Sequence, residues 1–123
     1  MSSRELAEYL KSQGYGITLT GSQSLVIEHP SLPIYLHLEF KGNLVYVSIG
    51  LNRDELREVL GEIRESGEDV EEVVEDALSY LNNASLKARK WLEERGYTAV
   101  FKIREGSIEI YEVLEEVLEE AAE

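Results

Sequence analysis

The most constraining feature of the sequence is an alternation of apolar and polar side chains from Ile34 to Lys41. An alternation with a period of two is typical of a β-strand with one buried and one exposed face. Gly42-Asn43 follows directly and predicts a two-residue hairpin turn. Folding the chain about this turn pairs apolar side chains: Phe40 with Val45, Leu38 with Val47, and Leu36 with Ile49. A slip of one residue would place them against the polar face, so the register is well specified.

The pairing of apolar side chains across turns also predicts two further strands before Ile34. A loop from Pro30 to Pro33 lets the strand before it pair in register with the strand that begins at Ile34. A loop over residues 21–23 lets one further strand, before residue 21, pair with the strand after residue 23. The resulting apolar pairs are Ile27 with Leu36, Leu25 with Leu38, Leu19 with Leu25, and Ile17 with Ile27. The sequence therefore predicts a four-stranded antiparallel meander with one apolar face.

Amphipathic helices are predicted before and after the meander, from apolar stripes and capping residues. The first begins at Ser2 or Ser3 and ends at Gly14, the second runs from Asn52 to Gly67, the third from Asp69 to Gly96, and the last includes Val113 to Ala121. Asn82 and Asn83 weaken the middle of the third helix. Whether the helix over residues 69–95 is continuous stays open.

A second hairpin is predicted before the last helix. A turn at Glu105-Gly106 would pair Ile103 with Ile108 and Phe101 with Ile110. We therefore expect one α+β domain over residues 1–123, in the order α-ββββ-α-α-ββ-α, with amphipathic helices packed on one face of the sheet. The buried face is predicted to contain Ile17, Leu19, Leu25, Ile27, Leu36, Leu38, Phe40, Val45, Val47, Ile49, Phe101 and Ile103.

The composition narrows the possible functions. A net charge of −13 argues against nucleic acid and anionic membranes as partners, because such partners need a positive surface. The absence of cysteine excludes disulfides, thiolate zinc sites and cysteine nucleophiles. No apolar run is long enough to span a bilayer and no signal sequence follows Met1, so we expect a cytoplasmic protein. The abundance of glutamate is typical of hyperthermophile proteins.

Two segments resemble the type III secretion chaperone fold. They are Pro33-Ile34-Tyr35-Leu36-His37-Leu38-Glu39-Phe40 and the predicted hairpin before the C-terminal helix. The order of helix, strands, helices, hairpin and helix is similar as well, although this chain has an extra strand and an extra helix. Proteins with this fold are small acidic homodimers that bind partner proteins. The resemblance therefore implies a chaperone- or adaptor-like protein.

An alternative hypothesis is a metal-dependent nuclease. Glu39 and Lys41 are two residues apart on one strand, so they share a face where they could hold a divalent ion and a phosphate. With Glu28 on the preceding strand, this pattern is similar to the restriction-endonuclease-like nucleases. Those nucleases follow the motif with a helix, whereas Gly42-Asn43 predicts an antiparallel strand here. Antiparallel pairing of the next strand would argue against the nuclease.

Other charged groups give weaker signals. His29 and His37 lie on opposite faces by parity, so we expect no shared metal and no cofactor. The acidic residues 68–76 begin a helix, where the helix dipole favours carboxylates. A basic segment over residues 85–104 could bind an anion, or its cations could complement the end of a helix. It contains Lys87, Arg89, Lys90, Arg95, Lys102 and Arg104, with Trp91.

The hypothesis that we prefer is a small acidic protein-interaction module without catalytic activity. The partner would be another protein or a second copy of the chain in a homodimer. A third helix longer than the sheet would expose Ala84, Ala88, Trp91 and Leu92, which a symmetry mate would cover. The residues predicted to bind the partner are Tyr35, His37 and Tyr46 on the polar sheet face, and Trp91.

Overall fold

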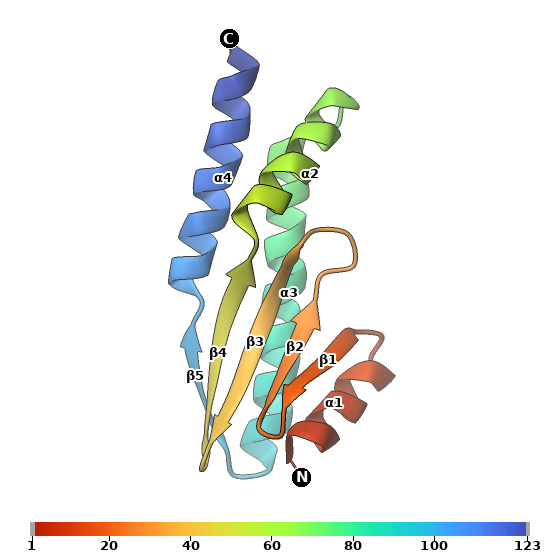
Figure 1. Cartoon of the computed structure of the whole chain (residues 1–123). Helices are drawn as coiled ribbons and strands as arrows, with labels where there is room; N and C mark the ends of the chain where they lie inside the picture. The colour runs from red at the N-terminus through yellow and green to blue at the C-terminus, as the bar shows by residue number, and fades with distance from the viewer. Residues whose placement is uncertain (1, 123) are drawn as a thin grey trace.

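The fold is an α+β arrangement built on a five-stranded mixed sheet, seen in a computed structural model that describes residues 2–122 and the side chains of residues 3–120 (Figure 1). The elements are α1 (Ser2–Ser12), β1 (Gly16–Gly21), β2 (Ser24–Glu28), β3 (Ile34–Lys41), β4 (Leu44–Leu51), α2 (Arg53–Glu65), α3 (Val70–Glu94), β5 (Thr98–Lys102) and α4 (Arg104–Ala122). The strands lie side by side in the order β1-β2-β3-β4-β5.

The antiparallel meander of β1 to β4 confirms the predicted register. Phe40 lies opposite Val45, and Leu36 lies opposite both Ile27 and Ile49. Gly42 adopts a positive φ of 62° in the turn between β3 and β4, a conformation that favours glycine. The predicted inner face is buried from β2 to β4 except for the half-buried Ile49, and Leu25, Leu38 and Val47 are at most 1 % exposed. Leu19 is an exception at 42 %, because β1 is an edge strand.

The predicted second hairpin is wrong. β5 pairs with β4 in the parallel sense, and the chain then enters α4 at Arg104, so Glu105-Gly106 begins a helix and not a turn. Gly106 packs so closely on Ile49 that a Cβ at residue 106 would stand 2.5 Å from the Ile49 carbonyl oxygen. The apolar side chains after it follow helical spacing, and the buried ones are Ile110, Val113, Leu114 and Val117.

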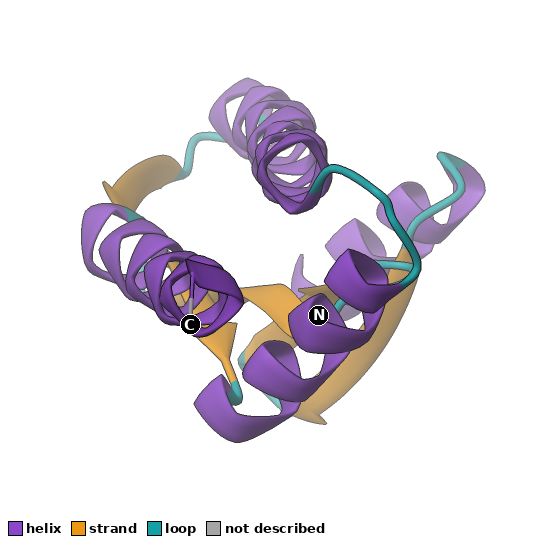
Figure 2. Cartoon of the chain, turned by 90° about the horizontal axis from the view of Figure 1, so that it is seen from above, coloured by secondary structure: helices purple, strands orange, loops and turns teal. Residues whose placement is uncertain are grey.

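Helices cover the inner face of the sheet. The α3 helix runs behind the strands over their whole length, and α1 packs on β1, while α2 and α4 extend past the end of the sheet (Figure 1). At that end, α2, α3 and α4 contact one another, as the view from above shows for their arrangement (Figure 2). Arg53 and Arg57 of α2 both bind the Glu116 carboxylate of α4, and the hydrogen bond from Arg57 lowers the pKa of Glu116. No helix in residues 2–122 has the length and apolarity needed to cross a bilayer.

Asn52 and Asp69 cap α2 and α3 as predicted, and α3 is continuous through Asn82 and Asn83. The Asn52 side chain accepts a hydrogen bond from the Glu55 backbone at 3.1 Å, and Asp69 accepts one from Glu72 at 3.3 Å. A single helix therefore spans Val70–Glu94.

The argument for a dimer from an overhanging helix is also wrong. Ala84, Ala88 and Leu92 are 0 % exposed within the single chain, and Trp91 is 7 % exposed. The α3 helix packs on the strands β3 and β5 and on α1, and the ring of Tyr9 in α1 stacks on Trp91 with centroids 6.3 Å apart. Arg95 covers the Trp91 ring as well, with its guanidinium carbon 3.9 Å from the ring centroid. Trp91 therefore belongs to the core of the single chain, and its predicted contact with a partner stays a prediction.

Candidate binding face of the sheet

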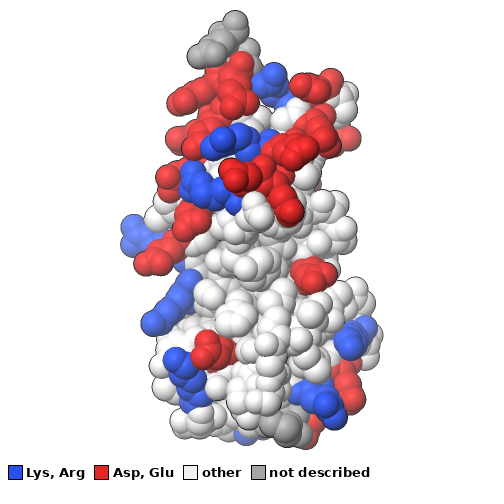
Figure 3. Space-filling view, in the orientation of Figure 1, with Lys and Arg blue, Asp and Glu red and all other residues white. Residues whose placement is uncertain are grey.

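The side of the sheet that faces away from α3 carries most of the predicted binding residues. We call it the open face (Figures 1 and 3). Every second residue of each strand points to this face, and the pairing of the strands aligns these residues in rows across the sheet. It includes Gly16, Thr18, Thr20, Ser24, Val26, Glu28, Tyr35, His37, Glu39, Lys41, Leu44, Tyr46, Ser48, Gly50, Thr98, Val100 and Lys102.

The central row crosses all five strands. Thr18 lies opposite Val26, Val26 opposite His37, His37 opposite Ser48, and Ser48 opposite Lys102. His37 and Ser48 are half-buried and line two adjoining hollows, one on either side of this row. The row therefore places an imidazole and a hydroxyl at the centre of the open face.

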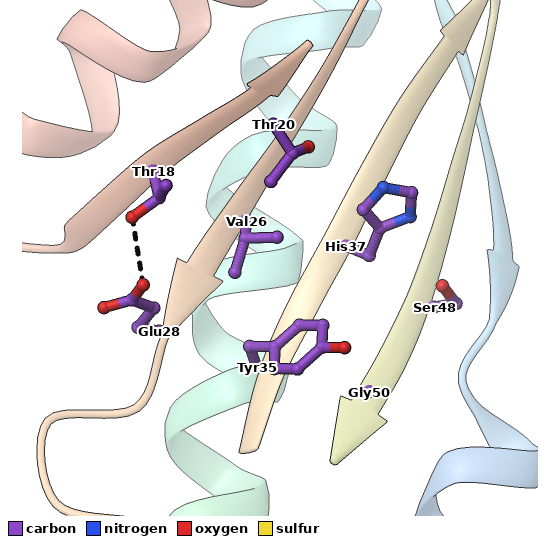
Figure 4. A pocket seen from close by; sticks show the side chains of 8 residues that line it. All are labelled: Thr18, Thr20, Val26, Glu28, Tyr35, His37, Ser48 and Gly50. Carbon is purple, nitrogen blue, oxygen red and sulfur yellow. Dashed lines mark hydrogen bonds between the residues drawn. The ribbon is translucent and has the colours of Figure 1, made fainter. Parts of the chain in front are cut away.

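The larger hollow has a volume of about 570 Å³ and extends from β1 to β4 (Figure 4). The ring of Tyr35 forms part of it and lies over Gly50, the residue opposite on β4, in the space where a side chain at residue 50 would stand. On the other side, the Thr18 hydroxyl donates a hydrogen bond of 2.9 Å to the Glu28 carboxylate. The hollow thus combines an aromatic ring with hydroxyl, imidazole and carboxylate groups.

The smaller hollow has a volume of about 290 Å³ and lies toward the turn between β3 and β4. The ammonium groups of Lys41 and Lys102 lie 5.5 and 5.1 Å from the centroid of the Tyr46 ring. Lys41 also forms an ion pair with Glu39 at 3.6 Å. A lysine over an aromatic face gains a modest cation–π attraction at an exposed site, so both lysines help to hold Tyr46 in place.

The open face differs in charge from the rest of the chain. It has two acidic residues, Glu28 and Glu39, and two lysines, Lys41 and Lys102, so its net charge is zero in a chain of net charge −13. Figure 3 shows this contrast: uncharged atoms dominate where the sheet faces the viewer, and charged side chains crowd the end formed by α2 and α4. A surface with few charged side chains and with aromatic groups costs less to desolvate than the acidic end of the chain, which favours contact with another molecule.

The residues proposed for a nuclease do not come together. Glu28 lies opposite Tyr35, and Glu39 is four residues further along β3, roughly 13 Å away. The strand after Lys41 pairs antiparallel with β3, the result that argues against the nuclease. Within the described residues, no group of three or more histidine, cysteine or carboxylate side chains is placed to bind a metal ion.

The basic segment over residues 85–104 does not form a single site. Arg89 binds Glu93 at 2.6 Å, Arg95 covers Trp91, and Lys87 lies 5.3 Å from the centroid of the Tyr15 ring. Lys102 instead belongs to the open face, because β5 pairs with β4. The position of Lys102 on the open face could not be predicted from the sequence, because β4 and β5 are separated in the chain by α2 and α3.

His29 has a structural role away from the open face. Its Nδ1 accepts hydrogen bonds from the backbone N–H groups of Ser31 and Leu32, at 3.1 and 2.9 Å. Its ring packs edge-on against Tyr80, with centroids 5.1 Å apart. Partial burial lowers the pKa of His29 below its ordinary value of 6.5. The neutral imidazole therefore closes the loop between β2 and β3.

Comparisons with known proteins find no matching family model, no matching curated protein and no matching solved structure. Of the two segments on which the expected likeness to the type III secretion chaperone fold rests, the first lies mostly in β3. The second is a strand followed by a helix, and not a hairpin.

Proposed function

We propose that the protein is a small protein-interaction module, chaperone- or adaptor-like, that binds a protein partner or a second copy of itself through the open face. The observation that carries this proposal is the neutral, aromatic character of the open face in a strongly acidic chain. Tyr35, His37 and Tyr46 supply side chains that combine an apolar ring with a polar group, which suits protein interfaces.

The size of the face supports a transient interaction. Its five strands, spaced about 4.8 Å apart, and the eight-residue length of β3 give an area on the order of 600 Å². A stable protein complex buries roughly 800 Å² on each partner. The open face is smaller, so we expect a partner that binds reversibly unless loops add to the contact.

The polar groups of the face favour specific contacts. Ser48 and His37 can donate or accept hydrogen bonds, while Tyr35 and Tyr46 provide contact area with few rotatable bonds. A complementary surface would cover the aromatic rings and pair with the central row. This chemistry is that of recognition, and the proposed activity is binding without catalysis.

The proposal is tested with a charge placed on the open face. Proteins from an extract of the source organism are captured on the wild-type chain and on Tyr46→Glu, with Asn83→Glu on the exposed surface of α3 as the matched control. A captured protein is then purified and its affinity for each variant is measured. We expect Tyr46→Glu to weaken binding by about tenfold or more and Asn83→Glu to leave it unchanged. Equal binding to all three would refute the proposal.

A further inference from the structure

The sheet has two edge strands, β1 and β5, which differ in their protection against pairing with another strand. Charged side chains and proline are the usual means by which an edge strand avoids such pairing. At β5, Lys102 ends the strand, and the guanidinium carbon of Arg89 lies 5.6 Å from the centroid of the Phe101 ring. The β1 strand has neither a charged residue nor a proline, and its pairing with β2 is regular as far as Leu19. β1 is therefore the less protected edge.

The backbone of β1 directs hydrogen-bonding groups away from the sheet. The residues of a strand point their N–H and C=O groups to alternate sides, and the His29 N–H at the end of β2 donates a bond of 3.0 Å to β3. Val26 lies three positions before His29, so its groups point to β1, where Thr18 lies opposite it. The groups of Thr18 thus face β2, and those of Ile17 and Leu19 face the free edge.

The free edge of β1 is open to contact. Residues 18–23, which include the turn to β2, are all exposed. The Leu19 side chain lies at the margin of the inner face and is among the most exposed large apolar side chains that the structure describes, at 42 %. A strand that paired with this edge would bury Leu19 and bond the outward backbone groups at the same time.

The sequence of β1 is complementary to a second copy of itself. Two β1 strands that are related by a two-fold axis run antiparallel, and their outward backbone groups meet when residues of the same parity lie opposite each other. An axis through Thr18 places Leu19 opposite Ile17 of the second copy, and Ile17 opposite Leu19 of the second copy. Both pairs are apolar and lie on the inner face, while Thr18 faces its own copy on the open face.

The charge around β1 permits this contact. Arg4 and Lys11 balance Glu5 and Glu8, so residues 2–24 have no formal net charge in a chain of net charge −13. The acidic side chains crowd the end formed by α2 and α4, whereas α1 and β1 lie toward the other end of the molecule (Figures 1 and 3). Two copies can therefore approach through β1 with less repulsion than through their acidic ends.

We propose that two copies of the chain pair through β1 into a symmetric dimer with one continuous sheet. Thr18 and Thr20 line the larger hollow where it reaches β1, so the larger hollows of the two copies would adjoin across the axis. The joined open faces would offer roughly 1,200 Å², more than the roughly 800 Å² that a stable complex buries on each partner. The pairing itself does not depend on the function proposed for the open face.

The first test is disulfide formation from a single introduced cysteine, because the chain has none of its own. An axis through Thr18 places residue 18 opposite itself, with Cα atoms about 4.5 Å apart, which a disulfide can span. Thr20→Cys on the same strand would face Gly16 of the second copy, and Thr98→Cys lies exposed on the other edge strand. We expect Thr18→Cys to form the linked dimer at least about tenfold faster than either control.

The second test places a charge on the edge. Leu19→Lys introduces the kind of side chain that protects edge strands, and it should weaken self-association by about tenfold or more. Leu86→Lys on α3 is the matched control, since Leu86 is an exposed leucine as well, at 49 %. Light scattering gives the mass over a concentration series that reaches about 1 mM, and circular dichroism checks that both variants fold. Leu86→Lys and Tyr46→Glu should associate as the wild type does.

Four results would overturn the proposal. Comparable disulfide formation in the three cysteine variants would mean random collision, and a single-chain mass at every concentration would mean that no dimer forms. A dimer that Tyr46→Glu dissolves and Leu19→Lys does not would assign self-association to the open face. A monomeric wild type that captures another protein, and loses it in Leu19→Lys, would assign the edge to a strand of that protein.

Discussion

The ring of Tyr35 lies over Gly50, the residue directly opposite it on the neighbouring strand, and occupies the space of the missing side chain. Gly50 has no positive φ, so its backbone conformation is open to other residues. The glycine therefore serves to make room for the tyrosine ring. This pair shapes the larger hollow of the open face.

A methyl group at residue 50 should displace that ring. The atoms that it would meet are the far end of the Tyr35 side chain, so we expect Gly50→Ala to fold, with a loss of stability of about 1 kcal/mol. The measurement is a double-mutant cycle with Tyr35→Ala by denaturant unfolding. The cost should disappear in the Tyr35→Ala background. The same cost in both backgrounds would show that Tyr35 is not the group displaced.

Truncation of a side chain on the inner face of the sheet should lower stability more than truncation on the open face. Leu38 is 0 % exposed at the centre of β3, and truncation to alanine should lower the free energy of unfolding by roughly 2–5 kcal/mol through loss of contacts and a cavity. The matched control is His37→Ala on the adjacent, open side of the same strand, with an expected change of about 0.5 kcal/mol. Comparable losses for the two variants would contradict the observed register.

His29 should make stability depend on pH. Burial lowers its pKa in the folded chain below 6.5, so between the folded and unfolded pKa values the unfolded chain binds more protons. This contribution is complete above pH 6.5 and is lost as the pH falls through the folded pKa. His29→Asn keeps a side-chain acceptor for the loop and should flatten the slope of stability below pH 6.5, whereas His37→Asn should retain the effect of His29. An unchanged slope in His29→Asn would refute this account.

The fluorescence of Trp91 tests whether the single chain buries the C-terminal part of α3. It is the only tryptophan of the chain and is 7 % exposed, because Tyr9 and Arg95 cover it. Its fluorescence should be blue-shifted and resist quenching by iodide, and dilution should not change this. Tyr9→Ala should increase the quenching. An increase on dilution of the wild type would mean instead that a second chain protects the ring.

The register of the meander could be predicted because it depends on local alternation. A slip of one residue would turn Val47 and Ile49 away from the face of Leu36 and Leu38, and the two-residue turn at Gly42-Asn43 selects one of the remaining registers. The same parity placed Tyr35, His37 and Tyr46 on the open face.

The parts of the fold and of the candidate site that were not predicted depend on contacts between distant segments. Ile108 and Ile110 alternate like a strand, yet Ile108 is 48 % exposed and Ile110 is buried in a helix. The pairing of β5 with β4 decides that Lys102 joins the open face, and the packing of Tyr9 helps to bury Trp91. Neither the pairing of β5 with β4 nor the packing of Tyr9 can be predicted from the local periodicity of the sequence.

Photo-crosslinking from Tyr46 tests the central claim most directly. A photoreactive phenylalanine derivative replaces Tyr46 in the full chain, and the same residue replaces Lys90, which is exposed on α3, as the control. Both proteins are irradiated in an extract of the source organism and the adducts are identified by mass spectrometry. We predict that position 46 forms a specific adduct with a protein partner or a second copy of the chain, and that position 90 does not. No adduct at position 46, or the same adducts at both positions, would contradict a binding role for the open face.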